Sequence, residues 1–489
     1  MDIHVEPRFW DWPLQGNDGV VKVENDDEKF VVDLEAHHFL PNEIQLPDDI
    51  DLTSVKSVLS PRGTLNIRAD KKTVNLLVFT IVIRAQSDPE ESMTPAEMIQ
   101  YWGYPLEKYD LVTPDGYILS MLRIPHGRNT ESKNSSCHRP PILLVHGAFT
   151  HAAQWVMNPP ESSPGMILAD AGFDVFMLNV RGTTHSRRHL TLTKDNRDYW
   201  KFTVDDMAKF DAPTAIDKAL ELNGANSLYY IGHSQGTVVG FLTLAENPAY
   251  NKKVSKVRAL FQLSPAGTLH YVKGLTKLLI WLVEVSRPVL SMMGPFEVGM
   301  NVQWLLGGAT KLFCPPIISS ELCKDVMELF AGPTSKTINW VRKISFDHIR
   351  LSDSRSYSTI HAGNLFKEKY SWRASITILE MAHRNSVHHY NHSPAENMRR
   401  YGHAKSLPYN YSNIDTDINM FWSRNDWATT PDEIEKWLIP HLRADVIKGS
   451  FEIPEYSHVG YTIATDCGER IFSKIIRIVR KYEMNSCVE

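Results

Sequence analysis

The chain has 489 residues, of which 43% are hydrophobic and 22% are charged, and its formal net charge is −5. This composition can build a large core, and the length allows one large domain with insertions plus a smaller unit, or two to three domains. Because there is no basic excess, the charge argues against nucleic-acid binding.

Cysteines and glycosylation sequons bear on the compartment of the protein. None of the five cysteines forms a C-x-x-C pair, so a zinc or redox motif has no support. Cys314 and Cys323 could close a small loop in an oxidising compartment, and buried free thiols are an equal alternative. Asn134, Asn391 and Asn410 are glycosylation candidates if the chain enters the secretory pathway.

The first zone, residues 1–72, is acidic and rich in strand-like stretches. Turn signals separate these stretches at Pro41-Asn42, Pro47-Asp48-Asp49 and Pro61-Arg62-Gly63. We therefore predict a small β-rich unit at the N-terminus.

A short junction, residues 73–93, separates this zone from the rest. It holds the apolar run VNLLVFTIVI at 74–83, which has the shape of a signal segment but is internal, while the first residues of the chain lack such a run. The run is too short to span a bilayer comfortably. Its β-branched residues also fit a buried strand.

From Thr94 onward, strand-like and helix-like segments alternate, which predicts a mainly parallel sheet with crossover helices. The predicted strands are Ile142–Val145, Phe173–Val180, Leu228–Ile231, Ala259–Leu263, Ile418–Trp422 and Phe451–Ile453. The predicted helices are Asp205–Leu222, Thr237–Glu246 and Gly468–Tyr482, where apolar residues recur at helical spacing.

The first predicted strand ends in Leu144-Val145-His146-Gly147-Ala148. A glycine at this place lets the backbone turn so that an N–H can point at a carbonyl oxygen. We predict the backbone N–H of Ala148 as one oxyanion donor and expect His146 to be structural. A plain strand-ending turn is the alternative.

Gly232-His233-Ser234-Gln235-Gly236 matches the G-x-S-x-G motif between a predicted strand and a predicted helix. That setting is what a nucleophilic serine needs, because a tight turn holds its hydroxyl at the sheet edge in a strained conformation. We predict Ser234 as the nucleophile and the N–H of Gln235 as the second oxyanion donor. A glycine-rich connecting turn is the alternative.

Between Ser264 and about Arg400 the strand signal disappears, which predicts a mostly helical insertion over the sheet. His388, His389 and His392 cluster here. Since no carboxylate pattern accompanies them, a solvated polar loop is favoured over a metal site.

A nucleophilic serine needs a base, and the base needs a carboxylate that fixes its tautomer. In parallel α/β sheets that carry a G-x-S-x-G nucleophile, the order along the chain is serine, acid, histidine. Asp426 follows the strand Ile418–Trp422, and His458 follows the strand Phe451–Ile453. We predict them as acid and base. Asp415 and Asp417 are rival acids, but they precede the strand.

From Thr94 to about Tyr482 the chain resembles the acid lipases of the gastric and lysosomal type. The resemblance rests on six segments: YWGYPLEKYDLVTPDGYILSMLRIPHG (101–127), LLVHGAFTHAAQWV (143–156), NVRGTTHSRRH (179–189), GHSQGT (232–237), HSPAENMRRYG (392–402) and WSRNDW (422–427).

The resemblance implies an α/β-hydrolase fold with a cap. It implies Ser234, Asp426 and His458 as the catalytic triad and Ala148 and Gln235 as oxyanion donors. The spacing of the cysteines at 314 and 323 looks like that family's cap disulfide. The implied organisation is a core in two parts, 94–264 and 401–489, with a cap at 265–400. Residues at about 343–384 do not match the family and look like an insertion into the cap.

The first zone resembles the small heat-shock proteins instead. EKFVVDLEAHHFLPNEI (28–44) looks like the start of an α-crystallin domain, and LPDDIDLTSVKSVLSPRGTLNIRADKK (46–72) looks like its end. The strands expected between them are absent, which predicts unpaired edges. The run at 74–83 then looks like the leader of the lipase, now internal, as in a fused gene product.

The sequence thus predicts a serine ester hydrolase that needs no metal or cofactor. Neutral lipid esters, triacylglycerol or cholesteryl ester, at a lipid–water interface are the expected substrates, and no protein partner is predicted. A carboxylesterase acting on smaller esters is one alternative, and a non-catalytic chaperone-like or lipid-binding protein is another. We expect a lysosomal or secreted location if the internal signal-like segment is used.

Overall fold

The structure is a computed structural model that describes residues 3–4, 21–25, 29–34, 43–44, 56–59, 65–70, 76–83, 93–128, 137–251, 256–278, 280–282, 285, 297–299, 328–334, 337, 369–483 and 488. The chain forms two compact units, the larger of which includes residues 93–309. Within the described ranges, no helix is both long enough and apolar enough to cross a bilayer.

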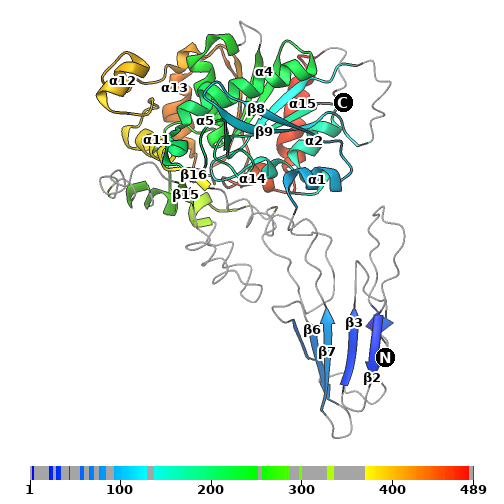
Figure 1. The fold of residues 1–489 in the computed structure, drawn as a ribbon. Coiled ribbons are helices and arrows are strands. Elements are labelled where there is room, and N and C mark those ends of the chain that lie inside the picture. The colour runs from blue at the N-terminus through cyan, green and yellow to red at the C-terminus, as the bar shows by residue number, and fades with distance from the viewer. Residues whose placement is uncertain are drawn as a thin grey trace. The chain divides into compact units, whose positions relative to one another are not determined.

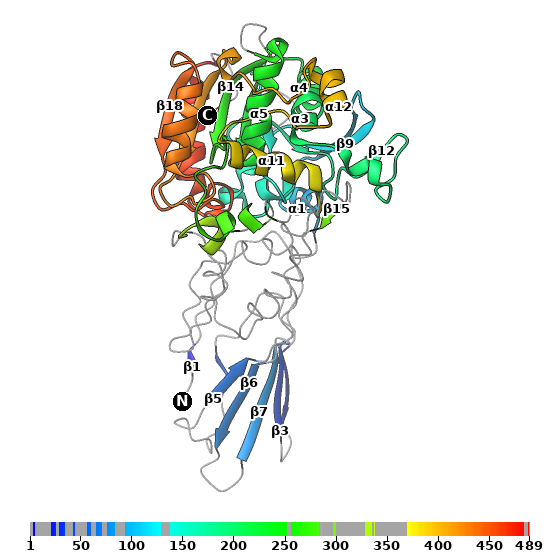
Figure 2. The same ribbon diagram turned by 90° about the vertical axis from the view of Figure 1, so that its left-hand side faces the viewer.

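A nine-stranded sheet is the centre of the larger unit (Figure 1). Its order is β12-β9-β11-β10-β13-β14-β17-β18, and β8 pairs with β9 on the side opposite β11. In Figure 2, β12 and β18 are seen at opposite sides of this unit. Neighbours from β11 to β18 are parallel, whereas β8, β9 and β12 form an antiparallel edge. The predicted α/β-hydrolase fold with a mainly parallel sheet is confirmed.

Each strand predicted in the larger unit overlaps a strand of this sheet, although the prediction Phe451–Ile453 meets only the last two residues of its strand, Ile447–Glu452. The bounds of the strands in this sheet are β8 Glu107–Val112, β9 Tyr117–Ile124, β10 Pro141–Val145, β11 Asp174–Asn179, β12 Arg188–His189, β13 Leu228–His233, β14 Val257–Leu263, β17 Asp417–Trp422 and β18 Ile447–Glu452.

Both faces of the parallel strands are buried. On β10, Ile142 and Leu144 pack into one apolar cluster and Leu143 and Val145 into the other, and all four side chains are inaccessible to solvent. Burial of one such side chain contributes about 1.5–3 kcal/mol. A strand buried on both faces appears in sequence as a continuous apolar run, which is why these strands could be predicted.

Helices cover the two faces (Figure 1). Residues of α4 and α5 belong to one cluster, and residues of α2 and α15 belong to the other. The described helices of the larger unit include α1 Pro95–Tyr101, α2 Pro164–Asp170, α3 Val204–Asp206, α4 Ala212–Asn223, α5 Gln235–Glu246, α11 Trp372–Arg384, α12 Pro394–Tyr401, α13 Ile439–His441, α14 Gly460–Ile463 and α15 Ser473–Arg480. A π-helical turn, Met207–Asp211, joins α3 to α4.

The cap prediction at 265–400 falls partly outside the described residues. Its described part holds α11, α12 and an unpredicted pair of short antiparallel strands, β15 Glu297–Gly299 and β16 Lys369–Ser371. Ser371 Oγ donates hydrogen bonds to the carbonyls of Trp200 and Phe202 at 2.8 and 2.9 Å. The end of the segment predicted as an insertion, 343–384, therefore packs against the core of the larger unit.

The smaller unit includes residues 1–92 and contains the predicted β-rich segment. Its five-stranded sheet has the order β2-β3-β7-β6-β5, and a two-stranded pair joins β1 Ile3–His4 to β4 Glu43–Ile44. The bounds are β2 Val21–Asn25, β3 Lys29–Leu34, β5 Lys56–Leu59, β6 Leu65–Asp70 and β7 Leu76–Ile83.

The apolar run at 74–83 supplies the central strand of this sheet. β7 pairs in parallel with β3 and antiparallel with β6. The run therefore fits the strand alternative, and its strand pairs with both β3 and β6, which belong to the two segments whose edges were expected to be unpaired.

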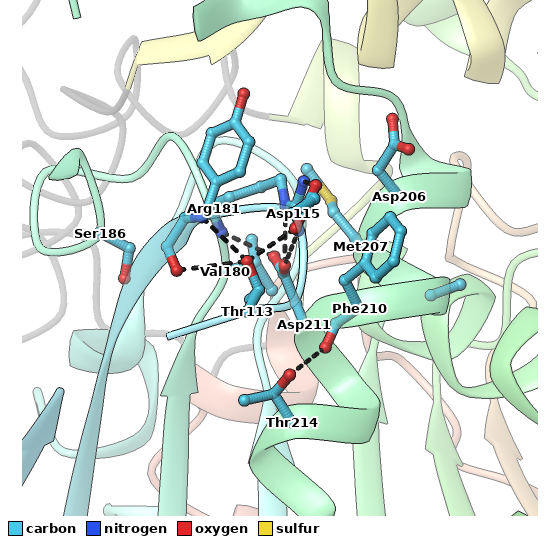
Figure 3. Close-up of polar contacts among 12 residues, drawn as sticks. Thr113, Asp115, Val180, Arg181, Ser186, Asp206, Met207, Phe210, Asp211 and Thr214 are labelled. Carbon is cyan, nitrogen blue, oxygen red and sulfur yellow. Dashed lines mark hydrogen bonds and ion pairs between the residues drawn. The ribbon is translucent and has the colours of Figure 1, made fainter. Parts of the chain in front are cut away.

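A buried ion-pair network ties together the elements that support one end of the sheet (Figure 3). Arg181 follows β11, and its side chain is inaccessible to solvent. Its Nε donates to Asp211 Oδ1 at 2.7 Å, and its Nη1 donates to Asp115 Oδ2 at 2.6 Å. The guanidinium lies 4.1 Å from the ring centroid of Tyr117. It thus links the β8–β9 turn to the π turn before α4.

Replacing Arg181 by methionine is expected to lower the free energy of unfolding by about 3–5 kcal/mol, because Asp211 would remain buried without its cation. Urea titration measures this loss. Arg188→Met is the matched control, since the ion pair of Arg188 with Asp110 has side-chain exposures of 58% and 56%. An exposed pair of this kind contributes at most about 1 kcal/mol. Equal losses in the two variants would contradict the expectation.

Candidate active site

The predicted strand–turn–helix around Ser234 is present. β13 ends at His233, α5 begins at Gln235, and Ser234 between them has φ +52° and ψ −116°. Positive φ is strained for a serine, as predicted for a nucleophile held at a sharp turn. A Cβ on Gly236 would lie 2.1 Å from the carbonyl oxygen of Val145, so only glycine fits there.

Ser234, Asp426 and His458 come together at the carboxyl ends of the parallel strands. Ser234 Oγ lies 2.8 Å from Nε2 of His458. On the other side of the imidazole, Nδ1 lies 3.1 and 3.2 Å from the two oxygens of Asp426. The histidine can therefore accept a proton from the serine while the carboxylate orients its ring.

Asp426 lies in a turn that supplies hydrogen-bond donors to its carboxylate. The side chain is fully buried, and its Oδ1 accepts bonds from the backbone N–H groups of Ala428 and Thr429 at 3.0 and 2.9 Å. Burial alone would raise the pKa of Asp426, but the charge and hydrogen bond of His458 and the other donors lower it below its ordinary value. The carboxylate is thus ionised at neutral and mildly acidic pH.

Sequence reasoning missed a fourth side chain at this site, Ser264. Its Oγ lies 2.6 Å from Asp426 Oδ2 and 2.8 Å from His458 Nδ1. The available signal was its position directly after the predicted strand Ala259–Leu263, since polar residues at the carboxyl ends of parallel strands meet at one edge of the sheet.

Of the two predicted oxyanion donors, Gln235 directly follows Ser234, and Ala148 follows Gly147 in the loop after β10. A Cβ on Gly147 would lie 3.2 Å from the Cβ of Ser234, so this loop packs directly against the serine. Among the described residues, no hydrogen bond uses the backbone N–H of Ala148 or of Gln235. Both N–H groups are therefore available to an oxyanion.

Two histidines near the serine form hydrogen bonds with backbone groups of the neighbouring loops. His146 donates from Nδ1 to the carbonyl of Gly147 at 2.8 Å and accepts at Nε2 from the N–H of Val180 at 3.1 Å, so it is structural as expected. His233 donates from Nε2 to the carbonyl of His458 at 3.0 Å. This bond ties the loop of the base to the residue before the nucleophile.

Comparison with known proteins decides the family. The family described as a partial alpha/beta-hydrolase lipase region matches residues 95–159, and the family described as the alpha/beta hydrolase fold matches residues 140–279. Lipase lipl-3 of Caenorhabditis elegans is 32% identical over 412 residues, which cover 83% of this chain and 97% of that protein. The chain belongs to the α/β-hydrolase lipase family.

Mammalian relatives of this lipase match over a similar span. Gastric triacylglycerol lipase of Bos taurus is 29% identical and covers 82% of this chain and 94% of its own. Lipase member M of Homo sapiens is 30% identical, with 81% and 88% covered. Among solved structures, a membrane phospholipase A described as a bacterial virulence factor aligns with a TM-score of 0.41 and 14% identity over 79% of this chain and 89% of its own.

The rival acids of this lipase lie away from the serine. Asp417 begins β17, and Asp415 precedes it, whereas Asp426 follows the other end of the strand. The Oδ2 of Asp417 accepts a hydrogen bond from the hydroxyl of Tyr482 at 2.9 Å. Neither rival is close to the imidazole of His458.

The histidines at 388, 389 and 392 lie in a loop, as predicted, but they are packed rather than solvated. His389 lies between the rings of Tyr401 and Tyr409, with centroid distances of 4.6 and 4.0 Å, and its Nε2 is 2.8 Å from a carboxylate oxygen of Glu246. Across the described part of the lipase, no cluster of three or more histidine, cysteine or acidic side chains could hold a metal ion.

The structure describes only some of the cysteines and glycosylation sequons that bear on the compartment of the protein. The predicted pair Cys314–Cys323 and the sequon at Asn134 lie outside the described residues. Cys137 is disulfide-bonded, and Cys467 is a buried free thiol. Asn391 and Asn410 are exposed, which leaves both sequons open to glycosylation.

The burial of three histidines is expected to make the stability of this lipase depend on pH. Burial lowers the pKa of His146 to about 4 and the pKa of His151 and His233 to about 3. In the unfolded chain a histidine has a pKa near 6.5, so it takes up protons that the folded chain excludes. This stabilising contribution is complete above about pH 6.5 and is lost toward pH 4, at about 1.4 kcal/mol per pH unit for each histidine.

The variant His146→Gln isolates one of these contributions, because glutamine does not titrate. We expect the variant to be less stable than the wild type at pH 7, and the difference to shrink as the pH falls from 6.5 to 4. Urea titrations at pH 7, 6, 5 and 4 measure it. A difference that stays constant with pH would contradict the assignment.

Proposed function

We propose that the protein is a serine ester hydrolase that cleaves neutral lipid esters, triacylglycerol or cholesteryl ester, through an acyl-enzyme intermediate. The observation that carries the proposal is the 2.8 Å contact between Ser234 Oγ and His458 Nε2, with Asp426 on the opposite nitrogen of the ring. Lipid esters at a lipid–water interface are proposed because the relatives are lipases.

The reaction has two acyl transfers. Ser234 Oγ attacks the ester carbonyl carbon while His458 Nε2 takes the hydroxyl proton, and the oxyanion receives hydrogen bonds from the N–H groups of Ala148 and Gln235. The protonated histidine then gives its proton to the leaving alcohol. Water, deprotonated by His458, releases the acid and restores Ser234.

A fluorophosphonate probe tests the chemistry. We expect one adduct, on Ser234, found by peptide mass spectrometry, and loss of ester hydrolysis in proportion to labelling. A label on another residue would contradict the mechanism. Absence of both labelling and hydrolysis would favour the alternative of a non-catalytic chaperone-like or lipid-binding protein.

A substrate series tests the substrate class. The lipase proposal expects turnover of trioleoylglycerol or cholesteryl oleate emulsions and of p-nitrophenyl palmitate. A preference for p-nitrophenyl butyrate, with no turnover of emulsified lipid, would indicate a carboxylesterase acting on smaller esters.

A lysosomal or secreted location is part of the proposal. It is supported by the disulfide bond of Cys137, because disulfides persist in oxidising compartments, and by the exposed sequons at Asn391 and Asn410. Sensitivity of the natural protein to an N-glycosidase, together with its N-terminal sequence, tests this location and shows whether residues 1–85 are retained.

A further inference from the structure

Ser264 occupies a central position between the strands that carry the nucleophile and the acid. It directly follows β14, which lies between β13 and β17 in the sheet. Its backbone N–H donates to the carbonyl of Phe421 at 2.8 Å, and the carbonyl of Leu263 accepts from the N–H of Ser234 at 3.1 Å. Its side chain is inaccessible to solvent, so its hydroxyl can bond only to protein groups.

The hydroxyl of Ser264 contacts three polar groups of the site. Its Oγ lies 2.6 Å from Asp426 Oδ2, 2.6 Å from Thr429 Oγ1 and 2.8 Å from His458 Nδ1. The oxygens of Asp426 are farther from this nitrogen, at 3.1 and 3.2 Å. The group closest to Nδ1 is therefore a serine hydroxyl that also touches the carboxylate.

The strength of the acceptors sets the direction of these bonds. A carboxylate is the strongest acceptor here, so Ser264 donates its single proton to Asp426. The Thr429 hydroxyl donates to the same carboxylate oxygen at 2.9 Å, so the lone pairs of Ser264 Oγ are free to accept from Nδ1–H of His458. With both hydroxyl protons directed at the carboxylate, no donor faces Nδ1 in this set, so Nδ1 carries the ring proton and Nε2 is unprotonated toward Ser234.

We propose that Ser264 is a positioning residue of the catalytic machinery, which holds His458 in the tautomer that can accept the proton of Ser234. This inference rests on the proposed function. When His458 becomes doubly protonated, the Ser264 oxygen accepts a hydrogen bond from Nδ1–H while the Ser264 hydroxyl still donates to Asp426. The hydroxyl and the carboxylate therefore both stabilise the charge of the imidazolium. Ser264 acts through His458 and Asp426 and does not touch the substrate.

The backbone of Ser264 offers a way to separate its hydroxyl from its conformation. Its φ is +52°, a left-handed value that costs a serine about 1–2 kcal/mol and that glycine adopts freely. Ser264→Gly therefore removes the hydroxyl and relieves the strain, whereas Ser264→Ala removes the hydroxyl and keeps the strain. A role of the hydroxyl requires both variants to lose activity alike.

The test measures kcat and KM with p-nitrophenyl butyrate, together with the rate at which a fluorophosphonate labels Ser234. We expect both variants to lose about 10-fold in kcat and in labelling rate, the effect of one lost hydrogen bond to a charged group, with KM within about twofold of the wild type. In the background of Asp426→Asn, Ser264→Ala should cost less than about twofold, because residues that act as a unit are not additive.

Two outcomes would overturn the proposal. One is a Ser264→Gly variant with the kcat and labelling rate of the wild type. The other is the same loss for Ser264→Ala with and without Asp426→Asn, which indicates an independent structural effect. Wild-type protein that neither reacts with the probe nor hydrolyses the ester would overturn the proposed function as well, whereas a reactive wild type with a fully active glycine variant overturns only the role of Ser264.

Discussion

Replacing Ser234 by alanine is expected to reduce kcat for ester hydrolysis by about 10⁵- to 10⁶-fold, the loss found when the nucleophile of a triad is removed. The alanine variant keeps its N–H groups for the oxyanion, but no hydroxyl remains 2.8 Å from Nε2 of His458 to form the acyl-enzyme. Initial rates with p-nitrophenyl butyrate at high enzyme concentration measure the loss.

Ser457→Ala is the matched control for this variant. Ser457 is the neighbour of His458 in sequence and is fully buried, and its hydroxyl has no hydrogen-bond partner among the described residues. Removing such a hydroxyl is expected to change kcat less than about twofold, because no bond is lost. A residual activity above about 1% in Ser234→Ala, or an equal loss in the control, would show that Ser234 is not the nucleophile.

The elements around this site could be predicted because their sequences carry strong local signals. Parallel strands buried on both faces, such as β10 and β13, appear as apolar runs. Ser234 could be placed because its turn needs small neighbours, and a Cβ on Gly232 would lie 2.6 Å from the carbonyl oxygen of Gly236. Asp426 and His458 followed from their places after late strands.

The antiparallel edge could not be predicted from apolar runs. β8 alternates exposed and half-buried residues over most of its length, so its sequence, Glu107–Val112, is mostly polar. Its pairing with β9 places Asp115 in the turn between them, within reach of Arg181. That contact joins residues 66 positions apart, and no local sequence pattern indicates a contact between residues so far apart in the chain.

The hydroxyl of Ser264 was missed for a related reason. Its importance depends on the neighbour order β13-β14-β17, which brings it beside Asp426, a residue 162 positions away. The sequence predicts that β14 is a strand but not which strands flank it. Functional residues at strand ends therefore become visible only when the order of the sheet is known.

Asp426→Asn is expected to reduce kcat by about 10⁴-fold while leaving the fold intact, because the amide favours the wrong tautomer of His458. The asparagine oxygen can still accept from the N–H groups of Ala428 and Thr429, which bond to Oδ1 in the native protein. This leaves the NH₂ group facing Nδ1 of His458. Nδ1 then accepts a hydrogen bond, the ring proton moves to Nε2, and Ser234 has no base.

Asp417→Asn separates this effect from the general loss of a buried carboxylate. Asp417 is also buried, at the other end of β17, and accepts a bond from the Tyr482 hydroxyl that an amide oxygen can accept equally well. The kcat of the Asp417→Asn variant should stay within about twofold of the wild-type value, since no hydrogen bond of the catalytic site is lost. Steady-state kinetics and the fluorophosphonate labelling rate measure both variants. If Asp426→Asn kept more than about a tenth of the wild-type kcat, Asp426 could not be the group that sets the tautomer.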